Sequence, residues 1–249
     1  MDVNAYLKRI DYRGPLAPDA ETLRGLHQAH LLAAPFENLD IHLGRPIVLD
    51  EARLFDKIVR RRRGGFCYEL NGLFAALLRA LGFKVTLLSA RVAAGEGRFG
   101  PEFDHLVLLV QLAERWLADV GFGDSFVEPL RLDEPGEQRQ RTGVYQIVRD
   151  GENLMMLKAD KAGDRVDGYL FTFRPRQLAD FAGMCHYQQT SPQSPFTQKR
   201  VCSRATPEGR VTLSDVRLIV TINGQRQERL LTGPEEYAAE LWKHFGIEL

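Results

Sequence analysis

The fold of this chain is decided by one stretch, Arg60-Arg61-Arg62-Arg63-Gly64-Gly65-Phe66-Cys67-Tyr68-Glu69-Leu70-Asn71. From its end onward, apolar residues recur at the spacing of a helix with one buried face, namely Leu70, Leu73, Phe74, Leu77, Leu78 and Leu81. Gly82 stands where a helix C-cap glycine belongs. The pattern therefore predicts that Cys67 lies at or near the N-terminus of a buried helix.

A cysteine at the start of a helix is favoured in its charged form. Unpaired N–H groups and the positive end of the helix dipole both stabilise a thiolate at that position. Such thiols have a pKa of roughly 3.5–7.5, compared with ~8.5 for a free cysteine. Gly64 and Gly65 are expected to leave the sulfur uncrowded and to allow a tight turn. We therefore expect Cys67 to be a nucleophile with a lowered pKa.

Length and composition indicate a globular protein. The chain has 249 residues, enough for one large domain or for two to three small subdomains that share a core. Lys plus Arg equals Asp plus Glu at 33 each, which argues against a general nucleic-acid binder. The first residues contain no apolar signal segment, and the longest apolar runs are too short to cross a membrane. We expect a cytoplasmic protein with neither nucleic acid nor membrane as a partner.

Cysteine usage points the same way. Cys67, Cys185 and Cys202 are an odd number of cysteines and form no Cys-x-x-Cys pair. A disulfide framework and a structural zinc site are therefore not expected.

The first third of the chain is predicted to be helical. Residues 19–32 and 51–62 both have a helical apolar rhythm, and the second helix leads into the arginine run. His27 and His30 lie one turn apart, but no further metal ligand accompanies them, so we expect two partly exposed helix histidines. The four arginines Arg60–Arg63 point in different directions at helical spacing. We interpret them mostly as a solvated face, with one or two of structural importance.

Strand patterns dominate the middle of the chain, and turn signals such as Ala113-Glu114 and Asp150-Gly151 separate them. They predict an antiparallel sheet curled into a barrel, with strands over residues 84–92, 105–112, 115–122, 145–149, 153–159 and 168–173. A last part follows, predicted to comprise a helical segment at 175–184, a polar linker at 188–195, strands at 200–205, 210–221 and 226–231, and an amphipathic helix at 235–245.

Candidate partners for the cysteine come from two neighbouring strands. A nucleophilic thiol needs a base that accepts its proton, and that base needs a group that orients it. His105 opens a strongly apolar strand and is the candidate base. Asp104 is its chain neighbour and would point to the opposite face of the strand. Asp119 lies in the next strand, where cross-strand neighbours face each other, and is the better third member. Asp104 is expected to form hydrogen bonds at the edge of the loop.

The run from Arg63 to Asn71 resembles the nucleophile motif of the arylamine N-acetyltransferases of bacterial type. Four other stretches match that family in the same order, so the resemblance spans nearly the whole chain: residues 35–39, 104–110, 116–123 and 191–196. It implies an α+β fold with a cysteine-protease/transglutaminase-like core. The expected parts are a helical domain at 1–83 with the nucleophile, a β-barrel at 84–188 with His105 and Asp119, and a C-terminal α/β lid at 189–249.

The resemblance also implies a reaction. An acetyl group would pass from acetyl-coenzyme A to Cys67 and then to an arylamine or hydrazine, with His105 moving the proton in this ping-pong scheme. Acetyl-coenzyme A would be a co-substrate, with no permanently bound cofactor and no metal. The Cys67 backbone N–H is a candidate donor to the oxyanion. Phe122, Gly123 and Phe196 are the expected contacts to the two substrates.

Glu37 is an acidic residue in an apolar setting. We predict that it pairs with Arg63 and locks the loop that carries Cys67, so that Glu37→Gln would cost folding stability. The alternative is an ordinary surface carboxylate.

Other functions fit the same residues. A papain- or transglutaminase-like hydrolase also places a cysteine at a helix start, with histidine and aspartate or asparagine on strands. An amide synthase on the same scaffold would close a chain carried as a thioester. A non-catalytic binding protein would leave Cys67 inert.

Overall fold

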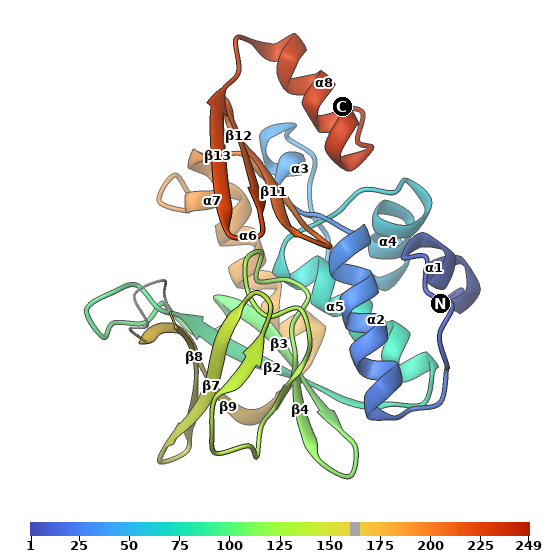
Figure 1. Cartoon of the computed structure of the whole chain (residues 1–249), viewed down its shortest axis with the longest axis vertical. Helices are drawn as coiled ribbons and strands as arrows, with labels where there is room; N and C mark the ends of the chain where they lie inside the picture. Colours follow the sequence, from blue (N-terminus) through green and yellow to red (C-terminus); the bar gives the residue numbers. More distant parts are fainter. Residues whose placement is uncertain (160–164) are drawn as a thin grey trace.

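The computed structural model describes residues 1–159 and 165–249, and it arranges them in three parts (Figure 1). Helices of the N-terminal third pack against a large curved sheet, and a smaller sheet with the C-terminal helix lies beyond them. This is the α+β architecture that the sequence predicted. Among the described residues, no helix combines the length and the apolar character that crossing a membrane requires.

The N-terminal part consists of short helices around one long buried helix. Asp19 caps the second helix by accepting a hydrogen bond from the Thr22 backbone N–H at 2.8 Å. The helix expected over residues 51–62 is instead a short α-helix that continues into a π-helical turn and stops at Arg60. The bounds are α1 Val3–Arg9, α2 Ala20–Ala33, α3 Leu39–His42, α4 Glu51–Phe55, η1 Asp56–Arg60 and α5 Cys67–Ala80.

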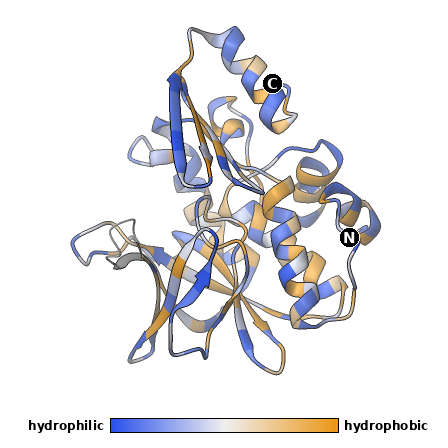
Figure 2. Cartoon of the chain, viewed as in Figure 1, coloured by the Kyte–Doolittle hydropathy of each residue, from blue (hydrophilic) through white to orange (hydrophobic). Residues whose placement is uncertain are grey.

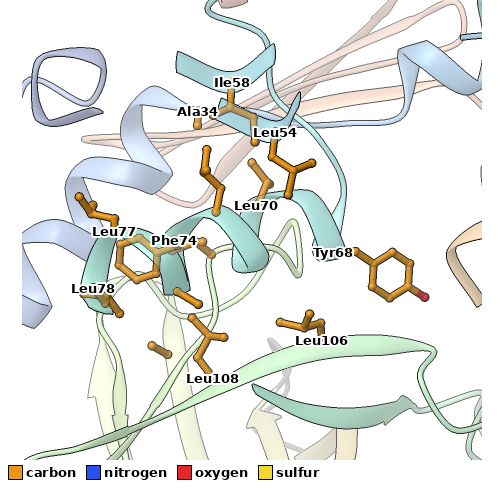
Figure 3. Close-up of a cluster of buried hydrophobic side chains, with 14 of the residues drawn as sticks. Ala34, Leu54, Ile58, Tyr68, Leu70, Phe74, Leu77, Leu78, Leu106 and Leu108 are labelled. Atoms are coloured by element: carbon orange, nitrogen blue, oxygen red, sulfur yellow. The ribbon is translucent and has the colours of Figure 1, made fainter. Parts of the chain in front are cut away.

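Helix α5 is the centre of the main hydrophobic core, and Cys67 is its first residue. Figure 3 shows that Leu106 and Leu108 lie on one side of this helix, with Leu54 and Ile58 on the other. Each fully buried leucine contributes about 1.5–3 kcal/mol relative to exposure. Such packing on both sides explains why the helix is apolar over most of its circumference, and it holds the position of Cys67.

The large sheet is antiparallel, with eight strands among the described residues in the order β5-β4-β3-β2-β9-β8-β7-β6. It curls into a near-barrel, and side-chain amides bridge its two edge strands. Gln138 of β6 both accepts from the backbone N–H and donates to the carbonyl of Arg131 in β5, each at 2.8 Å. The strands are β2 Lys84–Val92, β3 His105–Gln111, β4 Arg115–Ala118, β5 Leu130–Arg131, β6 Gln138–Gln140, β7 Gly143–Asp150, β8 Asn153–Ala159 and β9 Arg165–Arg176.

The small sheet joins distant parts of the chain in the order β1-β10-β11-β12-β13. Its first strand comes from the N-terminal third, so that Phe36 pairs with Ser203. The single strand expected over 210–221 is in fact a hairpin that turns at Asp215, which takes a positive φ of 46°. Figure 2 shows that the outer strand of the small sheet, β13, is hydrophilic. The elements are β1 Phe36–Glu37, β10 Val201–Thr206, β11 Gly209–Ser214, β12 Arg217–Ile222, β13 Gln225–Leu230 and α8 Pro234–Phe245.

The segment between the two sheets is more ordered than expected. It contains η2 Leu178–Phe181, α6 Ala182–Thr190 and α7 Pro195–Gln198. The prediction of a linker at 188–195 is wrong, because α6 continues through Gln188 and both Gln188 and Ser194 are buried. The Ser194 hydroxyl donates to the Gln188 carbonyl at 3.0 Å. Gln188 and Ser194 thus bond to each other inside the protein, whereas Thr190 and Gln193 are exposed.

Candidate active site

Cys67 occupies the first turn of α5 and is 4% exposed. The turn before it is held by Glu69, whose carboxylate accepts a hydrogen bond from the Phe66 backbone N–H at 3.1 Å. A carboxylate that bonds back to the residue before the first helical turn stabilises the start of a helix. The nucleophile candidate therefore lies at a rigid position.

His105 and Asp119 are buried and joined by a hydrogen bond, with 2.8 Å between His105 Nε2 and Asp119 Oδ2. The other carboxylate oxygen accepts from Asn71 Nδ2 at 2.8 Å and from the Gly121 backbone N–H at 2.9 Å. Burial acts to raise the pKa of Asp119, but the positive charge on His105 and these hydrogen bonds lower it overall. Asp119 is therefore held as a carboxylate.

The geometric reason given for Asp119 was wrong, although the structure does bring the two residues together. Strand β4 ends at Ala118, and Ala118 pairs with Leu108. Asp119 is thus not a cross-strand neighbour of His105 but the first residue of the turn after β4. Asp104 accepts a hydrogen bond from Gln188 Nε2 at 3.0 Å at the edge of the loop, as expected.

Asn71, one turn after Cys67, ties three elements together, and we had not singled it out as a site residue. Its Nδ2 also donates to the Leu106 carbonyl at 2.7 Å, and its Oδ1 accepts from the Val120 backbone N–H at 2.8 Å. The side chain therefore links α5 to the start of β3 and to the turn after β4. Its place in the cysteine motif was the signal that could have identified it.

The glycine that makes room for the cysteine is Gly121. A Cβ atom on Gly121 would lie 2.7 Å from Cys67 Cα and 2.8 Å from Asn71 Nδ2. Gly64 and Gly65 serve a different purpose from the one expected. Their added Cβ atoms would meet the Pro35 carbonyl and the Glu69 side chain, at 1.9 Å and 2.7 Å respectively.

The electrostatics of Cys67 also differ from the expectation. Burial raises the pKa of the Cys67 thiol, the charge of Asp119 acts in the same direction, and a hydrogen bond with the Leu106 backbone opposes them. The prediction that the helix start alone lowers the pKa of Cys67 is therefore wrong.

The predicted ion pair between Glu37 and Arg63 is present and fully buried. Arg63 Nε donates to Glu37 Oε1 at 3.0 Å, and Arg63 Nη2 lies 3.0 Å from Asp40 Oδ1. Lys57, which sequence reasoning missed, lies 2.8 Å from both Asp40 Oδ2 and Glu69 Oε1. We call these five residues the ionic cluster; its ion pairs join the loop before α5 to β1, α3, η1 and α5. The other three arginines of the run are exposed, as expected.

Aromatic side chains surround the candidate triad. The Phe122 ring lies 5.2 Å from the rings of His105 and of Tyr169, centre to centre. The Phe196 ring lies 5.7 Å from that of Phe66, the residue before Cys67. Gly123 has a φ of +90° and lies against the Phe36 ring. Tyr169 of β9 was missed by sequence reasoning, and burial raises the pKa of its phenol far above the usual range.

His27 and His30 are not partly exposed, as we expected, but completely buried at 0% exposure. His30 Nδ1 lies 2.8 Å from the Tyr6 hydroxyl, whereas both nitrogens of His27 bond to backbone groups. In the part of the chain that the structure describes, no three His, Cys, Asp or Glu side chains are placed to hold a metal ion. Cys185 and Cys202 are buried free thiols; Cys185 lies in the same hydrophobic core as Cys67, and Cys202 lies in the core of the small sheet.

Comparisons with known proteins agree with this architecture. The sequence profile of a family described as N-acetyltransferase matches residues 19–249. The chain is 38% identical over 230 residues to the pineal gland isozyme of arylamine N-acetyltransferase from Gallus gallus, covering 84% of this chain and 79% of that protein.

Solved structures are similar over almost the whole chain. The arylamine N-acetyltransferase of Nocardia farcinica superposes with a TM-score of 0.90 at 39% identity, covering 100% of this chain and 90% of that one. The Mycobacterium marinum enzyme in complex with CoA superposes with a TM-score of 0.92 at 31% identity, covering 99% and 93%. Together with the sequence match, these similarities define the class as acyltransferases that act on nitrogen. The chain belongs to the arylamine N-acetyltransferase family and is an enzyme of that activity, as the motif around Cys67 predicted.

Proposed function

We propose that the chain transfers an acetyl group from acetyl-coenzyme A to the nitrogen of an arylamine or hydrazine through an acetyl-Cys67 intermediate. The observation that carries this proposal is the buried hydrogen bond between His105, the first residue of β3, and Asp119. The backbone of Leu106, the next residue of β3, hydrogen-bonds to the Cys67 sulfur. Cys67 is the proposed nucleophile, His105 the proposed base and acid, and Asp119 the group that orients His105.

The first half-reaction forms the covalent intermediate. Cys67 Sγ bonds to the thioester carbonyl carbon while its proton passes to His105. The tetrahedral oxyanion is stabilised by N–H donors, and the Cys67 backbone N–H is our candidate for one of them. The bond from that carbon to the coenzyme A sulfur then breaks, and the departing sulfur takes the proton from His105. Because burial disfavours an isolated thiolate, moving the proton within the Cys67–His105 pair avoids a charge without a partner.

In the second half-reaction the amine nitrogen attacks the acetyl carbon of acetyl-Cys67. His105 accepts the proton that the nitrogen loses, the carbon–Sγ bond breaks, and Sγ regains a proton from His105. Asp119 stays ionised throughout and stabilises the imidazolium that forms twice in each cycle. This sequence returns the enzyme to its starting state and releases an amide.

Substrate contacts follow from the aromatic side chains around the triad. We propose that Phe122 and Phe196 pack on the acceptor ring and the pantetheine arm, and that Gly123 lets the arm pass close to the backbone. The related enzyme solved with CoA supports acetyl-coenzyme A as the donor. We further propose that residues 1–83 supply the nucleophile and 84–188 the other two triad members, with 189–249 acting as a lid, while Glu37 and Arg63 hold the loop before Cys67 in place.

Intact mass after mixing with acetyl-coenzyme A and no acceptor tests the proposal. We expect the wild type to gain one acetyl group, a Cys67→Ser variant to gain none, and a Cys202→Ser control, in the core of the small sheet, to behave as the wild type. Failure of the wild type to gain the group would refute the ping-pong scheme. A panel of arylamines and hydrazines, each expected to discharge the acetyl group faster than water does, then separates this activity from a hydrolase.

A further inference from the structure

A histidine far from the motif binds the backbone of the proposed triad. His27 lies in the middle of α2, and its Nε2 accepts a hydrogen bond from the Asp119 backbone N–H at 3.1 Å. Its Nδ1 lies 2.9 Å from the Val127 carbonyl oxygen. A backbone N–H can only donate, so Nε2 carries no proton. A carbonyl can only accept, so Nδ1 carries one. The ring is therefore neutral and in one tautomer.

The surroundings of His27 keep it in this state. Its ring stacks on Phe126 at 5.7 Å with an interplanar angle of 14°, and meets the edge of Phe74 at 6.0 Å. Burial lowers the pKa of His27 to about 4, against opposing effects of the Val127 hydrogen bond and the Asp119 charge. At neutral pH the imidazole is thus an uncharged group that is fixed on both sides.

We propose that His27 is a positioning residue that fixes the main chain at Asp119, and thereby aims the Asp119 carboxylate at His105. The inference rests on the proposed triad roles, whereas the hydrogen bond between His27 and the Asp119 backbone is independent of them. Asp119 follows the last residue of β4, so its N–H lies beyond the strand pairing of that sheet. His27 provides the partner for this N–H, while His105, Asn71 and Gly121 provide those of the carboxylate.

Losing this contact would affect the direction of the carboxylate. Without His27 the buried Asp119 N–H has no partner and the peptide can rotate to find one, because an unpaired buried N–H is costly. Rotation at Cα of Asp119 moves Oδ2 relative to His105 Nε2. Misplacement of a catalytic group by about 1 Å can lower a rate on the order of a hundredfold.

Four variants of the full chain separate positioning from folding. His27→Gln places an amide oxygen where Nε2 was and can still accept from Asp119. His27→Asn reaches only the position of Nδ1 and can still bond to Val127. His27→Leu removes both bonds. His30→Leu is the matched control, since His30 is equally buried one turn further along α2 but bonds to Tyr6 instead of Asp119.

The first measurement is the rate of acetyl-Cys67 formation in a single turnover with acetyl-coenzyme A, alongside the melting temperature. We expect His27→Asn and His27→Leu to be slower than wild type on the order of tens to a hundredfold, with His27→Gln within a few-fold of wild type. His30→Leu should lose melting temperature and keep the rate. The inference is refuted if His27→Asn reacts as fast as His27→Gln, or if His27→Leu reacts as fast as His30→Leu.

A second measurement does not depend on turnover. The low-field proton signal of the His105–Asp119 hydrogen bond should shift in His27→Asn and stay in place in His27→Gln and His30→Leu. An unshifted signal in His27→Asn would also overturn the inference. A wild type that takes up no acetyl group but shows these shifts would instead disprove the proposed function and leave the positioning contact intact. If His27→Leu does not fold, the Gln and Asn variants decide the question.

Discussion

Two buried polar clusters flank the start of α5, and they are built on opposite principles. The ionic cluster before the helix joins carboxylates of Glu37, Asp40 and Glu69 to the cations of Lys57 and Arg63. The cluster after β4 surrounds one carboxylate, that of Asp119, with hydrogen-bond donors. The first cluster contains two cations, Lys57 and Arg63, whereas the second contains the proposed acid–base residue, His105.

The difference separates stability from reactivity. A buried charge that loses its partner is expensive, so the ionic cluster resists any rearrangement of the loop before Cys67. On the other side, the Asp119 carboxylate is expected to stabilise the imidazolium of the proposed mechanism, so that a charge can form on His105 during the reaction while the fold stays intact. Variants in the two clusters should accordingly damage different properties of the enzyme.

The largest effect is expected for Asp119→Asn. The amide has nearly the same shape, but it presents an N–H or a neutral oxygen to His105 and no longer stabilises the imidazolium. The rate constant for acetylation of Cys67 should fall on the order of 10³–10⁴-fold, with a modest change in melting temperature. Asp104→Asn, next to His105 but bonded to Gln188, is the control and should change the rate by less than about tenfold. Equal losses in the two variants would contradict the role of Asp119.

Arg63→Met should have the next largest effect, and on stability. It leaves Glu37 and Asp40 without one buried cation, and the free energy of unfolding should drop by about 3–5 kcal/mol. Arg61→Met is a matched control in the same run, because the Arg61–Asp56 pair is exposed and contributes ~0–1 kcal/mol. Urea denaturation of the two variants measures both. Glu37→Gln changes a carboxylate of the same cluster and should also lower the folding stability. An unchanged melting temperature in this variant would contradict that expectation.

Gly121→Ala tests the contact between the turn after β4 and α5. Its new Cβ would press on Cys67 Cα and Asn71 Nδ2, so the turn must move, at a cost of about 1–3 kcal/mol. The acetylation rate should fall as well, because the displaced turn carries Asp119. Gly183→Ala, in α6 and with nothing within 4 Å of the added atom, should leave the rate unchanged and should not lower the stability, because alanine is favoured over glycine in a helix. Thermal melts and single-turnover rates compare the pair.

The smallest effect concerns pH. Burial raises the pKa of Glu69 to about 6, the charge of Glu37 adds to this, and Lys57 and the Phe66 N–H oppose it. Because the folded state binds this proton more tightly than the unfolded state does, its contribution to stability is present below pH ~4.5 and is lost as the pH rises through about 6. The loss is about 2 kcal/mol at most. The measurement is the unfolding free energy of the wild type and of Glu69→Gln from pH 4.5 to 7, and the difference between the two should change by this amount. Parallel curves for the two proteins would contradict the prediction.

Much of the fold was predictable because it follows local patterns. The period of apolar residues predicted the helix after Cys67, and strand β2 has the predicted bounds, 84–92. The turn inside 210–221 was not predictable in the same way. Asp215 takes a positive φ there without the help of a glycine or proline, which an aspartate tolerates. The linker at 188–195 was mispredicted because its polar side chains find partners only in the folded chain.

The residues of the candidate site also fall into those that local sequence could predict and those that it could not. Cys67, His105 and Asp119 could be chosen from residue chemistry and from the resemblance, although the cross-strand argument for Asp119 was wrong. His27, Lys57 and Tyr169 could not be chosen, because a sequence pattern does not reveal a hydrogen bond or ring contact to a residue far away in the chain. The buried state of His27 depends on Asp119 and Val127, some hundred positions further on. The polar neighbours of His27 in the sequence indicated an exposed side chain, but packing against distant parts of the chain buries it.

Strand β13 has a consequence for how the molecule behaves at high concentration. It is the outer edge of the small sheet and every one of its residues is exposed, so its free backbone groups could receive a strand from another molecule. Arg226, Glu228 and Arg229 lie along this edge and are paired with charges on the same molecule. An incoming strand would have to strip water from these charges, which disfavours edge-to-edge stacking and helps the enzyme to remain dispersed.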